Sequence, residues 1–309
     1  MLGTKKVETS TQSFKITNKK RKITSRLIAP WLFMAPAILI VLIFVAVPAV
    51  TGLGLSFFKY DGINPPNFTG LKNYAYLLND ELFLKSILVT VYYVVGSLIP
   101  AVAISLAIAI VLNKKWFPFK NIIRATYFLP TIVSMVAVAF VWKWLFNPQF
   151  GPVNEWLSSL GFPNQQFFGD PLLAMPMLII IGVWKAIGFN MVIYLAGLQG
   201  IDKSYYEAAE IDGASSLQQF WFITWPLLIP TTFFVVTMGV IGGFQIFDQI
   251  FIITGGGPAQ STYAIVFYIY QKAFEELTFG YSSSLSMILF IIILVITLIQ
   301  YKYMGKVQY

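Results

Sequence analysis

The chain has 309 residues, of which 57% are hydrophobic, 17% aromatic and only 11% charged, and its formal net charge is +8. This composition excludes an ordinary soluble domain and predicts an all-α integral membrane protein. Since the chain has no cysteine and no histidine, we expect no disulfide, no metal site and no catalytic Cys or His.

The first 27 residues form a polar, basic tail that we expect to be disordered. Six apolar stretches follow, each with the roughly 20 residues that a helix needs to cross a bilayer core. They are 30–53, 85–112, 124–146, 173–197, 227–252 and 282–303. The connections are too short to fold separately, so residues 28–309 are predicted to form one domain of six transmembrane helices.

The basic residues predict the orientation of these helices, because loops rich in Lys and Arg stay in the cytoplasm. Eight of them lie in the N-terminal tail, and the connection between the second and third stretches holds Lys114, Lys115, Lys120 and Arg124. Both termini are therefore predicted to be cytoplasmic. Because the basic residues flank apolar stretches, we expect contacts with membrane lipid and no nucleic-acid partner.

Polar residues inside the apolar stretches are candidates for a solute pathway, because burying them unpaired costs several kcal/mol. The candidates are Lys185 and Asn190 in the fourth stretch, with Trp184 beside them, and Gln245 and Asp248 in the fifth. Helical spacing would place Gln245, Asp248 and Gln249 on one face. The alternative is that Lys185 and Asp248 form a structural ion pair between neighbouring helices.

The connection 201–226 differs from the others because Asp202, Glu207, Glu210 and Asp212 lie within it. Ser204-x-x-Glu207 is the spacing of a capping box and predicts a helix from Tyr205 to Asp212. Gly213 suits the left-handed residue that ends such a helix. A second capping box is predicted at Ser216-x-x-Gln219. An acidic helix–turn–helix favours docking to a protein over contact with anionic lipid.

Within this connection, Glu207-Ala208-Ala209, Gly213, Ile223 and Pro226 resemble the EAA loop of binding-protein-dependent ABC importer permeases. Other segments are similar to the carbohydrate branch, which includes maltose, lactose and glycerol-phosphate permeases. These are 70–74 (GLKNY), 128–130 (FLP), 144–148 (WLFNP), 188–190 (GFN) and 254–258 (TGGGP). One departure is Trp225, where the family pattern usually has leucine.

The resemblance implies a type I ABC importer permease fold in a bacterial or archaeal inner membrane. It implies import of a sugar or oligosaccharide by alternating access, with a second similar permease, two ATPase subunits and an extracellular or periplasmic sugar-binding protein. The residues implied to contact the ATPase are Glu207, Ala208, Ala209, Asp212, Gly213, Ala214, Ile223 and Pro226. The turn at 255–258 is expected to touch the binding protein.

The chain contains no G-x-x-x-x-G-K-[ST] phosphate loop. ATP and Mg are therefore expected on the partner ATPase, with no cofactor and no enzymatic activity in this chain. One alternative is a permease for glycerol phosphate or another polyol derivative. Another is an ion-coupled secondary transporter, which would need carboxylates at mid-depth, broken helices or an internal repeat. An intramembrane enzyme is disfavoured because Lys185 has no obvious serine partner.

Overall fold

The computed structural model describes residues 21–114 and 119–304, and the chain divides after Gly52 into two compact units. The first unit contains helix α1 (Arg21–Val41), a π-helical turn η1 (Leu42–Ala46) and most of α2 (Val47–Leu55). The segment Ala29–Leu55 is long and apolar enough to cross a membrane.

The helix α1 begins inside the tail that was expected to be disordered, so this expectation is wrong for residues 21–27. Lysine and arginine are good helix formers, and no glycine separates them from the apolar segment that follows. The rest of the predicted tail lies outside the described residues.

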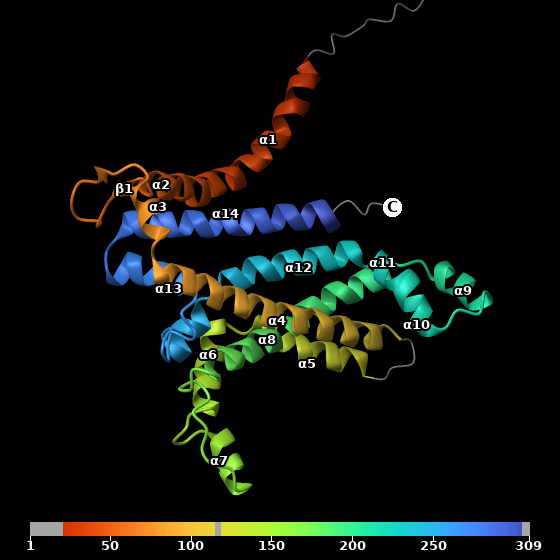
Figure 1. Ribbon diagram of the computed structural model, residues 1–309. Helices are drawn as coiled ribbons and strands as arrows, with labels where there is room; N and C mark the ends of the chain where they lie inside the picture. Colours follow the sequence, from red (N-terminus) through yellow and green to blue (C-terminus); the bar gives the residue numbers. More distant parts are fainter. Residues whose placement is uncertain (1–20, 115–118, 305–309) are drawn as a thin grey trace, which may run out of the picture. The chain divides into compact units, whose positions relative to one another are not determined.

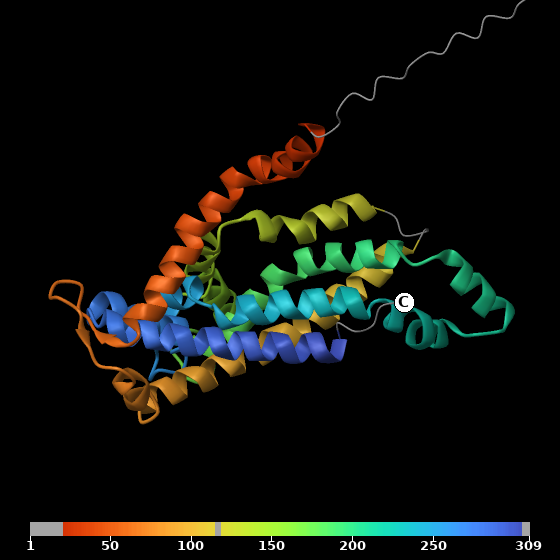
Figure 2. The ribbon, with the colours of Figure 1, turned by 90° about the horizontal axis from the view of Figure 1, so that it is seen from above.

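The second unit is a bundle of long helices. Its members are α4 (Glu81–Asn113), α5 (Lys120–Ile132), α8 (Ala174–Gln199), α12 (Ile229–Phe244) and α14 (Phe279–Met304). Helix α4 packs against α8 and α12, α5 packs against α8, and α14 packs against α12 (Figures 1 and 2). A Cβ atom at Gly239 would collide with the side chain of Leu98 in α4, and one at Gly243 would crowd the side chain of Val94. The missing side chains at these glycines let the two backbones approach closely.

The described residues include four single helices long and apolar enough to span a membrane, or up to six spans if two bent pairs are counted. One pair is α5 with α6 (Met135–Leu145), and the other joins residues 216–227 to α12. The all-α membrane fold is confirmed, whereas the number of six spans stays a prediction.

The third predicted stretch is not one continuous helix, because α5 and α6 meet at an angle of 98°. Val133 and Ser134, between them, have extended backbone. Pro130 in the last turn of α5 lacks an N–H and weakens the helix just before the break.

The fifth predicted stretch, 227–252, is also interrupted. Helix α12 ends at Phe244, residues 245–247 are not helical, and a π-helical turn η3 follows at Ile250–Thr254. Gly242 and Gly243 directly precede this break, and glycine is a poor helix former.

Short elements gather at the two ends of the bundle (Figures 1 and 2). At one end lie α9 (Lys203–Ile211), α10 (Ser216–Gln219), the π-helical turn η2 (Phe220–Thr224) and α11 (Trp225–Leu227). The opposite end, called the outer end below, holds an antiparallel pair of strands with Phe58 opposite Phe68, and three further elements. The strands are β1 (Phe58–Lys59) and β2 (Asn67–Phe68), and the three further elements are α3 (Lys72–Leu77), α13 (Ile265–Tyr270) and η4 (Gln271–Glu275). The remaining helix, α7 (Pro152–Ser159), follows α6.

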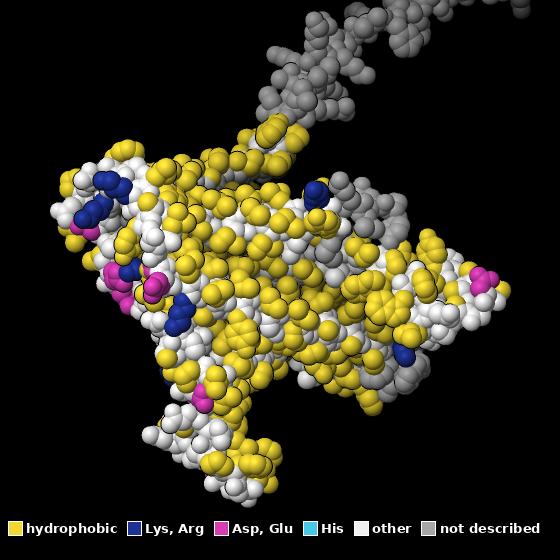
Figure 3. All heavy atoms as spheres, in the orientation of Figure 1, with side chains coloured by type: hydrophobic (Ala, Val, Ile, Leu, Met, Phe, Trp, Pro, Cys, Tyr) yellow, Lys and Arg dark blue, Asp and Glu magenta, His cyan; other side chains and the backbone are white. Residues whose placement is uncertain are grey.

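Figure 3 shows that charged side chains lie mostly towards these two ends, whereas hydrophobic side chains cover the middle of the bundle. This distribution is expected of helices whose middle part faces hydrocarbon.

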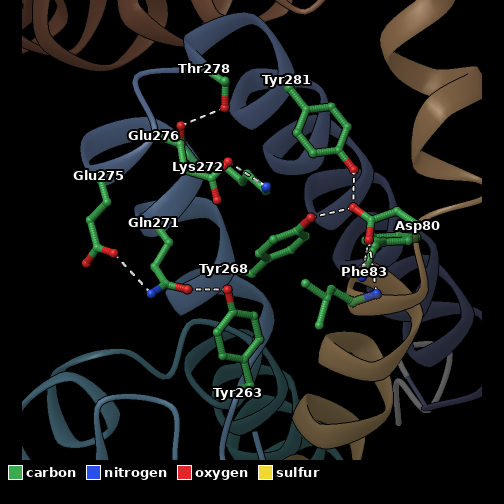
Figure 4. A network of polar contacts seen from close by, with 11 residues as sticks. Asp80, Phe83, Tyr263, Tyr268, Gln271, Lys272, Glu275, Glu276, Thr278 and Tyr281 are labelled. Atoms are coloured by element: carbon green, nitrogen blue, oxygen red, sulfur yellow. Dashed lines mark hydrogen bonds and ion pairs between the residues drawn. The ribbon is translucent and has the colours of Figure 1, made fainter.

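A polar network at the outer end joins three helices through Asp80 (Figure 4). The Oδ1 atom of Asp80 accepts hydrogen bonds from the N–H groups of Leu82 (3.0 Å) and Phe83 (3.2 Å) and caps α4. The Oδ2 atom accepts hydrogen bonds from the hydroxyls of Tyr268 in α13 and Tyr281 in α14. Burial alone would raise the pKa of Asp80, but the hydrogen bonds from the two tyrosines and the backbone lower it below its usual value.

Replacing Asp80 with asparagine is expected to lower the melting temperature of the purified protein, because an amide NH₂ cannot accept a hydrogen bond from a tyrosine. A hydrogen bond to a charged group contributes about 1.5–3 kcal/mol. Since the folded state lowers the pKa, the stabilisation is complete above the ordinary aspartate pKa of about 3.9. It is lost as the pH falls through the lower folded value.

The measurement is the melting temperature of both proteins in detergent between pH 6 and pH 3. The wild-type value should fall towards that of Asp80→Asn as the pH decreases. Asp61→Asn is the comparison variant: Asp61 accepts its hydrogen bonds from Asn64 within one exposed loop and joins no helices, so this change should lower the melting temperature less than Asp80→Asn does. Equal melting temperatures for Asp80→Asn and the wild type at pH 6 would show that the network does not stabilise the fold.

Candidate functional site

The two helix breaks face a common cavity of about 390 Å³. Thr131 and Met135 flank the break between α5 and α6, and the break after α12 contributes residues 245–247 together with the two residues that follow it, Asp248 and Gln249. Helix α8 supplies Lys185 and Phe189 to the wall. Irregular backbone at membrane depth is tolerated where it is buried in protein or lines a water-filled cavity. The cavity therefore explains why the chain tolerates both helix breaks, because it is where their irregular backbone lies.

A second cavity of about 300 Å³ shares Tyr93, Gly182, Ala186, Phe189 and Gly242 with the first, and it adds Asn190. The structure thus brings Lys185, Asn190, Gln245 and Asp248 to two adjoining cavities. Trp184 does not line either of them, and its ring lies edge-on to Trp142 with 5.8 Å between centroids. Gln245, Asp248 and Gln249 reach the first cavity from a broken segment, so the prediction that they share one helical face is wrong.

Lys185 caps the C-terminal end of α5 at the break between α5 and α6. Its Nζ atom donates hydrogen bonds to the carbonyl oxygens of Pro130 (3.1 Å) and Val133 (2.5 Å). The hydroxyl of Thr131 in turn donates to the carbonyl oxygen of Lys185 (3.4 Å). A cation at a helix C-terminus is favourable because the terminal carbonyls carry partial negative charge.

The proposed ion pair between Lys185 and Asp248 is not formed. Among the described residues, the one salt bridge joins Lys272 to Glu276 at 2.7 Å, at the outer end. The partners of Lys185 are backbone carbonyls that the broken helix leaves free, which no pattern of side chains in the sequence could reveal.

Gln249 and Tyr93 form a buried pair on the wall of the first cavity. The Nε2 atom of Gln249 donates a hydrogen bond to the hydroxyl of Tyr93 (2.7 Å), and the residue is only 3% exposed. Its Oε1 atom is buried and has no hydrogen-bond partner within the described chain. In the sequence, Gln249 is noticeable because its side-chain amide lies in an apolar run. Tyr93 could not be singled out in this way, because tyrosines are common in such helices.

The acidic connection forms a capped helix, α9. The carboxylate of Asp202 accepts a hydrogen bond from the N–H of Ser204 (2.9 Å) and caps the helix, which lowers the pKa of Asp202. The predicted start at Tyr205 and the capping box of Ser204 and Glu207 are therefore wrong. Aspartate caps helices as well as serine does, and its earlier position lets Lys203 and Ser204 join the first turn.

The end of α9 agrees with the prediction, because Gly213 has a left-handed backbone with φ of +77°. The N–H of Gly213 donates to the carbonyl of Glu210 (3.1 Å), and that of Ala214 donates to the carbonyl of Ala209 (2.8 Å). This pair of bonds is a Schellman motif, which fixes the direction in which the chain leaves the helix.

The second capping box exists but lies one residue earlier than predicted. The N–H of Ser215 donates to Oε1 of Gln218 (2.7 Å), and the N–H of Gln218 donates to Oγ of Ser215 (3.4 Å). A hydrogen bond of 2.9 Å between the hydroxyls of Tyr206 and Thr224 then joins α9 to η2. Since η2 continues through α11 towards α12, the helix–turn–helix is connected to a long helix of the bundle without a flexible linker.

The surface of this helix–turn–helix combines carboxylates with uncovered apolar side chains. Glu207, Ala208, Asp212 and Gly213 are exposed, whereas Ala209, Ala214, Ile223 and Pro226 are partly buried. The apolar residues Ile211 and Leu217 are 87% and 67% exposed. An exposed apolar patch rimmed by charged side chains indicates a protein contact.

A third cavity, of about 760 Å³, is larger than these two and lies at the outer end beside the Asp80 network, where Tyr60, Tyr76 and Tyr281 are part of its wall. It contains none of the residues predicted for solute or ATPase contact. Nearby, Nζ of Lys85 donates hydrogen bonds to Gln260 (2.9 Å) and to the carbonyl of Ala259 (3.3 Å), which ties the turn after Pro258 to α4.

Comparison with known proteins identifies relatives over most of the chain. A family model described as "Binding-protein-dependent transport system inner membrane component" matches residues 84–304. The chain is 33% identical to the arabinooligosaccharides transport system permease protein AraP of Bacillus subtilis, covering 91% of this chain and 90% of AraP. It is 34% identical to the sn-glycerol-3-phosphate transport system permease protein UgpA of Agrobacterium fabrum, covering 90% of this chain and 95% of UgpA.

The fold is also similar to a solved structure. The crystal structure of a bacterial alginate ABC transporter in complex with an alginate pentasaccharide-bound periplasmic protein contains a chain with a TM-score of 0.78 and 24% identity. The match covers 92% of this chain and 95% of that one. The likeness shows that the two chains share the same overall fold.

Proposed function

We propose that this chain, which belongs to the family of binding-protein-dependent transport system inner membrane components, is the permease subunit of an ABC importer that moves a sugar or oligosaccharide into the cytoplasm. The observation that supports this most directly is the continuity between the acidic helix–turn–helix and the cavity. Helix α12 has 16 residues, about 24 Å at 1.5 Å per residue, and it leads from the acidic helix–turn–helix to the cavity.

The same continuity suggests how ATP hydrolysis on other chains drives transport. Two ATPase subunits would each bind the acidic helix–turn–helix of one permease, with Glu207 facing basic residues of the ATPase. The ATPases bind ATP and Mg, and this chain does no chemistry of its own. Closure of the ATPases would move α9, and the capped turn at Gly213 would pass the motion to α12. A rotation of α12 changes access to the cavity, which is alternating access.

A second, similar permease would complete the cavity. Gln245 and Asp248 are exposed in the single chain. A carboxylate and an amide in a membrane-embedded segment do not face hydrocarbon, because desolvation without a partner is costly. A second subunit across a water-filled pathway would cover them. Lys185, Asn190, Gln245 and Asp248 are then the solute-facing residues of this half, with Trp184 outside the cavity.

The outer end is proposed to receive a sugar-loaded binding protein. The similar alginate transporter was solved with a periplasmic protein bound to a pentasaccharide. The turn at 255–258 and the large cavity beside Tyr76 lie at this end. With the helix–turn–helix in the cytoplasm, both termini are proposed to be cytoplasmic and the protein to reside in a bacterial inner membrane.

A second candidate solute is glycerol phosphate, because the similarity to UgpA is as high as that to AraP. An ion-coupled secondary transporter also uses broken helices. However, such a transporter does not need a rigid acidic loop that docks onto a separate ATPase. The family match also supports the importer.

The test is to purify a tagged version of the subunit from gently solubilised membranes and to identify stoichiometric partners by mass spectrometry. Wild type should retain an ATPase and a second permease, whereas Glu207→Arg should lose the ATPase because it reverses the charge on the docking surface. Glu155→Arg makes the same change on α7, outside the docking surface, and should keep every partner. A lone oligomer without an ATPase, or an ATPase still bound by Glu207→Arg, would contradict the proposal.

A further inference from the structure

The cavity between the two helix breaks has no net formal charge. Among the residues that line it, Lys185 and Asp248 carry the only charged side chains, one of each sign. The adjoining cavity that contains Asn190 has no charged residue in its wall. An anionic solute such as a phosphate ester usually binds where a free cation, a bidentate arginine or an open helix N-terminus awaits it. Whether Lys185 can act as such a cation therefore decides the selectivity.

The ammonium group of Lys185 is already hydrogen-bonded to the backbone of α5. Two of its three N–H groups donate to the carbonyls of Pro130 and Val133. These carbonyls belong to the C-terminal end of α5, whose partial negative charge offsets part of the positive charge. By contrast, the carboxylate of Asp248 is exposed and has no hydrogen bond or ion pair to any described residue. The uncompensated charge at the cavity is thus negative.

The other polar groups of the wall are neutral and suit hydroxyl groups. Gln245 and Gln249 contribute amides, and Thr131 and Tyr93 contribute hydroxyls. Since the Tyr93 oxygen accepts a hydrogen bond from Gln249, its proton is available to another acceptor. The buried Oε1 of Gln249 lacks a donor. A sugar hydroxyl both donates and accepts, whereas a phosphate dianion only accepts. The ring of Phe189 adds an apolar surface for the C–H face of a sugar.

We infer that this cavity selects uncharged, hydroxyl-rich solutes and rejects anionic ones, and that Asp248 is the residue that excludes anions. The inference rests on the proposed function, since it assigns a solute class to the same pathway. It separates a neutral sugar from glycerol phosphate, which the resemblance to relatives alone does not do.

The test compares each neutral sugar with its aldonic acid, in which C1 of the reducing-end residue is a carboxylate and that ring is open. The probes are lactose, maltotriose and arabinotriose, the aldonic acid of each, and sn-glycerol 3-phosphate. Initial uptake is measured in cells that express the complete transporter. We expect uptake of at least one neutral sugar and at least tenfold slower uptake of its aldonate. In Asp248→Asn the ratio of the rate for the neutral sugar to the rate for its aldonate should fall severalfold.

Asp248→Ser is a second variant that removes the same charge with a smaller side chain, and the amount of each protein in the membrane is measured in parallel. Glu155→Gln removes a carboxylate away from the cavity and should leave the ratio unchanged. Uptake of a neutral sugar and its aldonate at equal rates would overturn this inference alone, and so would an unchanged ratio in both Asp248 variants. Uptake of glycerol 3-phosphate without any neutral sugar would overturn the inference and the proposed sugar specificity together.

Discussion

Valine at position 213 is expected to abolish ATP-driven uptake while the subunit still inserts into the membrane. Gly213 has a positive φ, +77°, and a branched side chain in that conformation costs about 1–3 kcal/mol. The helix end would relax to a negative φ, which breaks the Schellman bonds of Gly213 and Ala214. The chain would then leave α9 in another direction, and the link to α12 would no longer be rigid.

The measurement is sugar uptake together with the ATPase activity of the purified complex. The ATPase activity should lose its dependence on the loaded binding protein. Gly213→Asn should retain most uptake, since asparagine tolerates the left-handed conformation. Gly161 at the end of α7 has a similar φ of +85° and, like Gly213, open space around it, so Gly161→Val imposes the same strain elsewhere. Normal uptake by Gly213→Val would rule out the coupling role of this turn.

Methionine in place of Lys185 is expected to reduce uptake to background and to lower the melting temperature of the complex. The substitution keeps the length of the aliphatic chain but removes the donor to the carbonyls of Pro130 and Val133. A hydrogen bond to a charged group contributes about 1.5–3 kcal/mol, and the bond to the Pro130 carbonyl is partly shielded from solvent. Without this cap, the angle of 98° between α5 and α6 would no longer be fixed.

Arginine at position 185 should restore part of both properties, because its guanidinium can also donate to two carbonyls. A lysine that served only to contact solute would behave differently. In that case Lys185→Met would raise the KM for uptake and leave the melting temperature unchanged, and this result would exclude the capping role.

The sequence predicted the membrane helices well where they are straight and failed where they break. Helices α4, α8 and α14 cover the second, fourth and sixth predicted stretches. The apolar run continues across Val133, and on either side of Gln245 it resumes at once with Phe244 and Ile246. A scale that sums the transfer free energies of side chains does not contain the direction of the backbone, so it could not detect either break.

The helix–turn–helix was predicted to within one or two residues, because Gly213 has a strong conformational preference whereas its caps do not. Asp202 and Ser204 compete for the start of one helix, and Ser215 and Ser216 for the next. Capping free energies of these residues are nearly equal. The order of residues alone therefore leaves the boundaries open.

The cavity was predicted in part. Lys185, Asn190, Gln245 and Asp248 were found through the cost of burying polar groups, and the structure gathers them in two adjoining cavities. Trp184 was included because it adjoins Lys185 in sequence, but neighbours on a helix point about 100° apart. Tyr93 was missed because α4 comes from a distant part of the chain, and only the packing of α4 on α8 brings it there.

Because Lys185 is hydrogen-bonded to the end of α5, the electrostatic potential of the cavity depends on the conformation of the backbone there. As long as α5 and α6 keep their bend, the ammonium is shared with two carbonyls and the cavity is slightly negative. Any movement that straightens this pair of helices would absorb those carbonyls into a continuous helix and release the ammonium. The same residues would then present a free cation to the cavity, so the electrostatic potential of the cavity would become more positive without any movement of α8.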